Sequence, residues 1–226
     1  FAKSNNGIFK LRIEDTDKIR NNESSIHSII NGLGWLGLSF EKNIIYQSEN
    51  KNKHVEIANK MIEKGFAYKC FHNENEINIK KNKNKKFISD WRDRSIKHPV
   101  GKPFSIRIKT STEGKTFIND KIQGKVEIDN SEIDDYVIIR SDGTPTFLLS
   151  SAIDDYLMKV THIIRGDDHL TNSLRQMIIF HFLNYNPTFA HMSLIHNEQN
   201  KKLSKRDNVL SIDDYKSKGY LAESLV

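Results

Sequence analysis

The sequence is short of cysteine and has no long apolar segment. Cys70 is the single cysteine among 226 residues, which excludes an internal disulfide and a metal site built from several cysteines and suits a reducing compartment. No run approaches the roughly 18 apolar residues of a membrane-spanning helix, and the first residues have no signal-peptide character. We therefore expect no membrane association.

Apolar and basic residues, by contrast, are plentiful. Hydrophobic residues make up 37% of the chain and include 12 Phe and 7 Tyr, enough for a packed core and too many for a wholly disordered chain. The length fits one large domain or two ordinary ones. The net charge of +6 permits a polyanionic partner such as RNA without requiring one. The first residue is Phe1, and the chain stops inside a helix-like segment, so we expect an interior piece of a longer protein.

The first part of the chain alternates between strand and helix patterns. Residues 8–13 are β-prone and lead into an acidic turn. Apolar residues at helical spacing between 26 and 33 predict a helix that Ser24 caps and Gly37 ends. A second helix with an apolar stripe is expected to end at Gly65. This order is the opening of an α/β layer.

The middle of the chain has a different character. Residues 80–86 form a basic, low-complexity patch, with a helix expected just before it at 74–80. Residues 141–144 carry the Asp-Gly signal of a tight hairpin turn. Short β-like segments are predicted at 104–109, 116–119, 125–128 and 136–140. This part reads as a β-rich insertion.

The α/β pattern then returns. Residues 160–165 predict a strand, and the apolar stripe that follows predicts a helix capped by Thr171 or Asn172. Another strand is expected at 189–195, followed by a polar loop at 198–207. We therefore predict an α/β layer that is split by the β-rich insertion.

The most informative candidate site is the basic loop at 201–206. Lys202 and Lys205, three residues apart around Ser204, could wrap a triphosphate and neutralise charge that builds on it as a bond to the α-phosphorus forms. The competing interpretation is a solvated basic loop, which an arbitrary lysine-rich segment would favour.

Two acidic turns at predicted strand ends are further candidates, because ligands bind at the carboxyl edge of open α/β sheets. Glu14 could hold an ammonium group, although acidic turns and helix caps are common. Arg165 could bind a carboxylate in a bidentate manner, and Asp168 could accept a ribose hydroxyl. An Arg–Asp ion pair within the turn is an equally good interpretation of that segment alone.

A metal-dependent hydrolase is disfavoured. Adjacent acids on a strand point to opposite faces, so the Asp-Asp doublets rarely form two-metal sites. The C-terminal histidines lack zinc-motif spacing with a thiolate partner and are expected to be scattered surface and core residues; they are His162, His169, His181, His191 and His196. We expect no metal site.

Taken together and in order, these segments resemble the bacterial-type glutamyl-tRNA synthetases, which are class I enzymes. The matching letters are RIEDTD at 12–17, SDGTPT at 141–146, THIIRGDDHLTN at 161–172 and KLSKR at 202–206. The resemblance covers essentially the whole chain. It implies a Rossmann-type parallel sheet without its first strand, in an internal fragment that lacks the HIGH motif and the anticodon-binding region.

The resemblance also implies an activity, that of a glutamate–tRNA ligase. In that family the α-carboxylate of glutamate attacks the α-phosphorus of ATP, pyrophosphate leaves, and the terminal adenosine of tRNA takes the glutamyl group. Matched by motif, Glu14 would hold the α-ammonium of glutamate and Arg165 a carboxylate. Phe147 and Ser151 would line the same pocket, where many members have Tyr and some have Asn.

The same matching assigns the nucleotide contacts. Asp168 would lie at the adenylate ribose, and Lys202, Ser204 and Lys205 would bind the ATP phosphates, with the two lysines acting in catalysis. ATP would enter as its Mg²⁺ complex. Zinc-binding members use cysteine and tyrosine ligands in the insertion; here His72 replaces one cysteine and aromatic residues fall near the later positions, so no zinc is expected.

The implied domains are a catalytic domain in two halves, 1–47 and 148–196, an acceptor-stem-binding α+β insertion at 48–147, and at 197–226 a KMSKS-type loop with the start of a helical stem-contact region. The implied partners are glutamate, ATP and tRNA(Glu), with tRNA(Gln) as a second candidate. A monomer in the bacterial cytoplasm or an organellar matrix is expected.

For this chain alone we expect little or no aminoacylation. The alternative that stays open is an eroded paralogue that acts as a non-catalytic RNA-binding module.

Overall fold

The computed structural model describes residues 1–16, 23–84, 87–93, 99–197 and 211–225. The chain packs into two compact units, Phe1–Asn50 with Ile195–Val226, and Lys51–Leu194. None of the described helices is long and apolar enough to cross a membrane. The implied domain boundaries at residues 47, 148 and 196 concern function rather than packing and stay predictions.

The first unit contains a parallel strand pair. β1 (Arg12–Ile13) lies beside β2 (Ile45–Tyr46), with α1 (Glu23–Trp35) between them in sequence. The predicted strand at 8–13 is shorter than expected, because only its last two residues pair with β2. The prediction that Ser24 caps the helix is wrong, since α1 begins one residue earlier. The remaining elements are η1 (Lys3–Asn5), η2 (Gln47–Asn50), α6 (Ile212–Ser217) and η6 (Ala222–Ser224).

The second unit contains two sheets. The antiparallel sheet has the strand order β3 (Ala67–Cys70), β4 (Ser105–Ile108), β7 (Val137–Ile139). The mixed sheet has the order β6 (Gly124–Asp129), β5 (Lys115–Asp120), β9 (Thr188–Met192), β8 (His162–Gly166). Strands β8 and β9 are parallel over five residue pairs, while β5 and β6 form an antiparallel hairpin. The strands predicted in the middle of the chain and the predicted α/β class are confirmed, while the insertion as a domain of its own stays a prediction.

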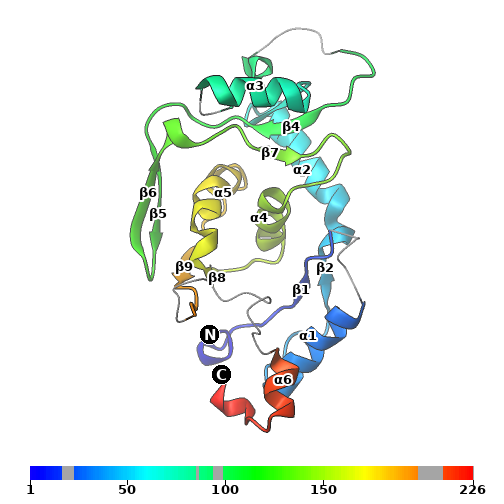
Figure 1. The fold of residues 1–226 in the computed structure, drawn as a ribbon, viewed down its shortest axis with the longest axis vertical. Helices are drawn as coiled ribbons and strands as arrows, with labels where there is room; N and C mark the ends of the chain where they lie inside the picture. The colour runs from blue at the N-terminus through cyan, green and yellow to red at the C-terminus, as the bar shows by residue number, and fades with distance from the viewer. Residues whose placement is uncertain (17–22, 85–86, 94–98, 198–210, 226) are drawn as a thin grey trace. The chain divides into compact units, whose positions relative to one another are not determined.

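Helices pack between these sheets. In Figure 1, α4 (Phe147–Leu157) and α5 (Leu170–Phe182) lie next to each other, with α2 (Lys51–Glu63) beside α4 and the β5–β6 hairpin beside α5. The unit also contains α3 (Glu74–Asn84), η3 (Asp90–Asp93), η4 (Asn130–Glu132) and η5 (Asp167–His169). Helix α5 begins at Leu170, so Thr171 and Asn172 lie inside it and that cap prediction is wrong.

The main core of the second unit joins α2, α4 and α5 to strands of both sheets. Its fully buried members include Met61 of α2, Ile108 of β4, Leu149 and Ile153 of α4, and Phe180 of α5. The apolar stripes predicted for α2 and α5 therefore face this core. Members of this core lie on α4, α5 and β8. Of the candidate site residues in this unit, Phe147 and Ser151 lie on α4, Arg165 lies on β8 and Asp168 lies in η5.

Candidate active site

Arg165 lies near the carboxyl end of β8, and three uncharged acceptors hold its guanidinium. Nε donates to Nε2 of His191 at 3.3 Å, and Nη2 donates to Oγ of Ser173 at 2.5 Å and to Oε1 of Gln176 at 2.9 Å. These contacts fix the plane of the guanidinium. A cation oriented in this way at the end of a parallel strand is suited to bind a carboxylate.

Two of these acceptors come from α5, and sequence reasoning missed both. Ser173 and Gln176 are 0% and 1% exposed, and their spacing of three places them on one face of the helix. That face packs on the core, as Leu174 and Ile179 of the same helix also do. Polar residues on an otherwise apolar helix stripe were the signal that could have identified them.

Ser151 and Phe147 lie on α4, one turn apart. The Ser151 hydroxyl is buried; it donates to the Phe147 carbonyl at 2.6 Å and accepts a bond from Nε2 of Gln176 at 2.8 Å. Gln176 thereby links Ser151 to Arg165. The Phe147 ring is half-buried and packs on the His169 ring, with centroids 5.5 Å apart. Direct contact of Phe147 and Ser151 with glutamate stays a prediction.

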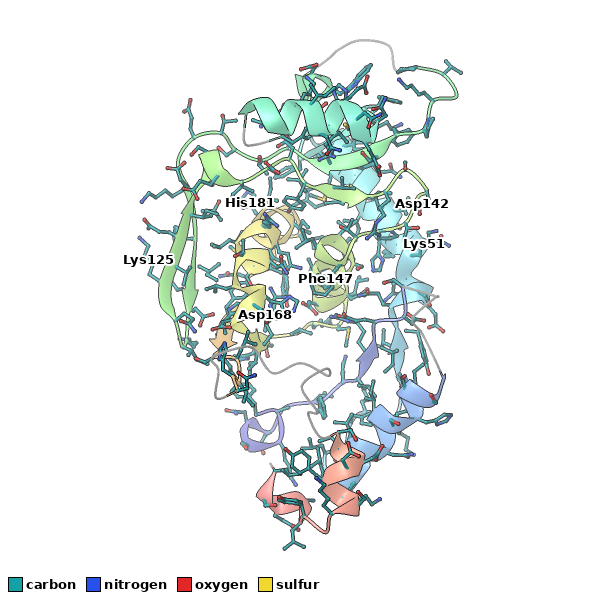
Figure 2. The ribbon with its side chains drawn as sticks, in the orientation of Figure 1. Lys51, Lys125, Asp142, Phe147, Asp168 and His181 are labelled. Atoms are coloured by element: carbon teal, nitrogen blue, oxygen red, sulfur yellow. The ribbon has the colours of Figure 1, made fainter. Side chains whose placement is uncertain are left out.

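Asp168 lies in η5, three residues after Arg165. Its side chain is exposed (Figure 2, where Phe147 is also labelled). A Cβ atom at residue 166 would lie 2.7 Å from Oδ1 of Asp168 and 2.9 Å from Cδ2 of Leu194. Glycine is therefore required here for the Asp168 carboxylate to keep its place beside the strand end.

Glu14 lies in the first unit, directly after β1, with an exposed side chain. Nη2 of Arg12 donates to its Oε1 at 3.3 Å. The neighbouring Asp15 accepts two bonds from Ser48, from the backbone N–H at 2.7 Å and from the hydroxyl at 2.5 Å. Asp15 therefore fixes the loop after β1 against the start of η2 and leaves Glu14 accessible to solvent.

The remaining candidates lie outside the described residues. These are Lys202, Ser204 and Lys205 in the basic loop at 201–206, so their assignment to the ATP phosphates stays a prediction.

Comparison with known proteins decides the family. The whole chain, residues 1–226, matches the family model for the catalytic domain of class I tRNA synthetases of the E and Q type. The chain belongs to this synthetase family. The resemblance inferred from the motifs is therefore confirmed at the level of the family, and so is the α/β fold.

The similar proteins within this family are glutamate–tRNA ligases. Glutamate–tRNA ligase 2 of Rickettsia felis is 46% identical over 233 residues, which cover 100% of this chain and 50% of that protein. The enzyme of the same name from Rhodospirillum centenum is 41% identical with the same coverage. A crystal structure of a glutamate tRNA ligase from Elizabethkingia meningosepticum, in complex with its amino acid, matches with a TM-score of 0.85 at 29% identity, over 100% of this chain and 54% of that one. The chain spans about half the length of the curated relatives that it matches.

The region where some synthetases bind zinc is filled by aromatic side chains. Cys70 is buried with its Sγ 3.7 Å from Oγ of Ser89, and the fully buried Phe87 lies against His72 with ring centroids 6.0 Å apart. Trp91 packs edge-on against Phe71. Within the part of the chain that the structure describes, no group of three His, Cys, Asp or Glu side chains is placed to hold a metal ion. That this synthetase binds no zinc stays a prediction.

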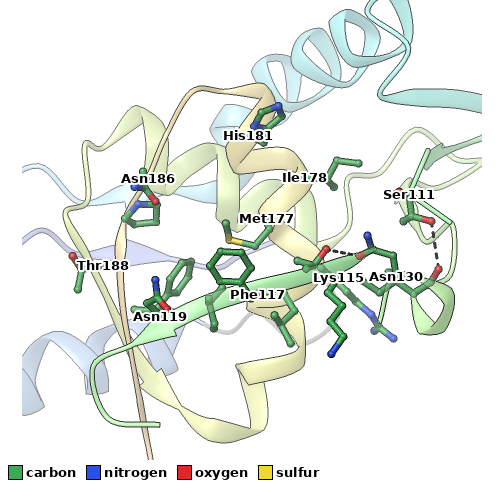
Figure 3. A pocket seen from close by; sticks show the side chains of 18 of the residues that line it. Ser111, Lys115, Phe117, Asn119, Asn130, Met177, Ile178, His181, Asn186 and Thr188 are labelled. Carbon is green, nitrogen blue, oxygen red and sulfur yellow. Dashed lines mark hydrogen bonds between the residues drawn. The ribbon is translucent and has the colours of Figure 1, made fainter. Parts of the chain in front are cut away.

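A cavity of about 710 Å³ lies elsewhere in the second unit (Figure 3). It is lined by the β5 side of the hairpin, by the outer face of α5 and by the residues that lead into β9, and includes Phe117, Asn119, Met177 and His181. None of the candidate residues that the structure describes lines it. It opens near the amino end of β9, whereas Arg165 pairs with His191 near the carboxyl end of that strand.

Proposed function

We propose that this chain forms the catalytic core of a glutamate–tRNA ligase. The observation that carries the proposal is the Arg165 guanidinium, fixed by three buried, uncharged acceptors at the end of β8. A guanidinium held in this orientation at a strand end is suited to bind a carboxylate of defined geometry. Glutamate supplies two carboxylates, and the curated relatives that match this chain are named glutamate–tRNA ligases.

The first step of the proposed reaction activates glutamate. Glu14 holds the α-ammonium and Arg165 a carboxylate, while Asp168 accepts a ribose hydroxyl of ATP, which enters with its Mg²⁺. An oxygen of the α-carboxylate forms a bond to the α-phosphorus, and pyrophosphate leaves with the electron pair of the broken P–O bond. Lys202 and Lys205, with Ser204 between them, offset the negative charge that develops on the phosphates.

The second step transfers the glutamyl group. A hydroxyl of the terminal adenosine of tRNA attacks the carbonyl carbon of the adenylate, and AMP leaves. The insertion at 48–147 would bind the acceptor stem, where lysine contacts to the phosphate backbone are blind to sequence and weaken with salt. We propose tRNA(Glu) as the substrate, with tRNA(Gln) as a second candidate, for a monomer in the bacterial cytoplasm or an organellar matrix.

A non-catalytic RNA-binding module is not favoured. Such a module would have no use for the buried side chains that orient Arg165, because they lie in the core of the unit and contribute nothing to a basic surface. Burying Ser173 and Gln176 costs free energy unless each is hydrogen-bonded, and an apolar pair would be a simpler solution for a purely structural helix.

The proposed role of the basic loop is tested with Lys205→Ala in the full-length product of the gene. Loss of a cation at the developing phosphate charge should lower the rate of glutamate-dependent pyrophosphate exchange by about 10²–10³ with tRNA present. Lys3→Ala, which changes an exposed lysine of η1, is the control and should keep the wild-type rate. An unchanged rate for Lys205→Ala, or exchange that glutamate does not support in the wild type, would count against the proposed function.

A further inference from the structure

A second layer of buried polar groups lies behind Arg165. His191 is 0% exposed, and its Nδ1 lies 2.6 Å from Oδ2 of Asp120, which is 5% exposed. The Asp120 carboxylate also accepts the backbone N–H groups of Ile122 and Gln123, both at 2.9 Å, and that of His191 at 3.1 Å. The turn after β5 is thereby tied to β9.

These partners fix where the protons lie. Burial alone would raise the pKa of Asp120, but hydrogen bonds from Gln123, His191 and Ile122 outweigh it and lower the pKa to about 2, so the carboxylate is ionised and only accepts. Nδ1 of His191 therefore donates to Asp120, and because Arg165 can only donate, Nε2 of His191 is the acceptor in their contact. That nitrogen lies 3.3 Å from Nε of Arg165 and 2.8 Å from Oγ of Ser173.

The donors and acceptors in the rest of the network are fixed in the same way, each by its neighbour. Because Arg165 can only donate, Gln176 turns its carbonyl oxygen to Arg165 and its amide nitrogen to the Leu148 carbonyl, at 3.1 Å, and to Ser151. The Ser151 hydroxyl in turn donates a hydrogen bond to the Phe147 carbonyl. Every donor meets an acceptor along a path from Asp120 to the start of α4, and this consistency depends on the tautomer of His191.

We infer that Asp120 and His191 are positioning residues for substrate binding: the carboxylate sets the His191 tautomer, and the imidazole then holds the Arg165 guanidinium toward the substrate carboxylate. This inference rests on the proposed role of Arg165 in binding glutamate. Neither residue touches substrate in this scheme. The same logic holds for groups that orient a ligating histidine from behind, where the outer partner controls both tautomer and direction.

The decisive variant is Asp120→Asn in the full-length product of the gene. The side-chain oxygen can still accept the backbone N–H groups of the turn, so the turn is retained. The new amide N–H₂ faces Nδ1 of His191, which must give up its proton, and the proton moves to Nε2, where it opposes the N–H of Arg165. We expect KM for glutamate in pyrophosphate exchange to rise about tenfold or more, with KM for ATP changed by less than about twofold.

The matched control is Asp154→Asn. Asp154 forms the other fully buried pair of this kind in the described part of the unit, with its Oδ1 2.8 Å from Nε2 of His54. This variant should lower the thermal unfolding midpoint without a change in KM for glutamate. If Asp154→Asn and Asp120→Asn raise KM for glutamate equally, the effect of Asp120 is a general loss of packing and the inference is overturned.

A double-mutant cycle separates the inference from the proposed function. In an Arg165→Gln background, Asp120→Asn should add nothing further to KM for glutamate, because it acts through the missing guanidinium. If Arg165→Gln itself leaves KM for glutamate unchanged, the proposed function of Arg165 is wrong. If Arg165→Gln raises KM and Asp120→Asn does not, only the positioning role is wrong.

The tautomer itself can be measured without activity. In protein with ¹⁵N-labelled histidine, long-range ¹H–¹⁵N spectra distinguish a protonated ring nitrogen from an unprotonated one. His191 should be protonated at Nδ1 in the wild type and at Nε2 in Asp120→Asn. A wild-type signal with the proton on Nε2 would overturn the inference, and assignment is checked by loss of the signal in His191→Gln.

Discussion

Asp135→Asn should strongly destabilise the second unit, although the two side chains have nearly the same shape. The Asp135 carboxylate is 0% exposed and accepts bonds from the hydroxyl of Tyr68 at 2.9 Å, from Nη1 of Arg92 at 3.0 Å, and from the backbone and hydroxyl of Thr110 at 3.0 and 2.8 Å. An amide keeps one accepting oxygen and turns its N–H₂ toward donors. The largely buried Arg92 also loses its counter-charge, so the expected loss is about 3–5 kcal/mol of unfolding free energy.

The measurement is urea unfolding followed by Trp91 fluorescence. Trp91 lies next to Arg92 in η3, and Trp35→Phe in the background leaves it as the single tryptophan. The control is Glu127→Gln, which breaks ion pairs to Lys115 and Lys125 on the exposed hairpin and should leave the unfolding midpoint unchanged. A loss below about 1 kcal/mol for Asp135→Asn would refute the argument that this carboxylate is held in a water-free site.

Two further predictions concern the strand end at the site and alkaline stability. Gly166→Ala should raise KM for ATP in pyrophosphate exchange about tenfold and KM for glutamate less, because the new methyl group displaces the Asp168 carboxylate; equal effects on both would contradict the assignment of Asp168 to the ribose. Burial raises the pKa of Tyr68 and of Tyr136 above the usual range. Since each phenol has a higher pKa folded than unfolded, its contribution to stability is complete below about pH 10 and declines as the pH rises further. Tyrosinate absorbance should show both phenols ionising only together with unfolding, and early ionisation of either would refute this.

Secondary structure could be predicted where one periodicity dominates. The apolar stripes of α2 and α5 predicted those helices, because a helix that packs on a single core buries apolar residues at helical spacing. Residues 8–13 were over-predicted, because an apolar run indicates a strand without saying that a partner exists: Ile8 is 72% exposed and unlike Ile13 has no pairing strand. The predicted helix starts at Ser24 and Thr171 were wrong because the helices begin at Glu23 and Leu170, and a residue that can cap a helix can also lie within its first turn.

In the candidate site, the sequence indicated the charged residues of the motifs but not the buried side chains that hold them. Arg165 and Asp168 stand at a strand end in a recognisable motif, whereas His191 was interpreted as one of several scattered histidines. Its role depends on Asp120, which lies 71 positions away in sequence, and no local pattern reports such a pairing. Ser173 and Gln176 were hidden for a related reason, because their partners are on other elements.

Because Cys70 is buried, the reactivity of its thiol reports local opening of the structure around β3. The thiol is 1% exposed in β3 and is the single cysteine of the sequence, so a thiol-reactive dye can modify the protein only while that strand is separated from its neighbours. The rate of this reaction then measures how often the antiparallel sheet comes apart, with one signal, no engineered label and no competing site.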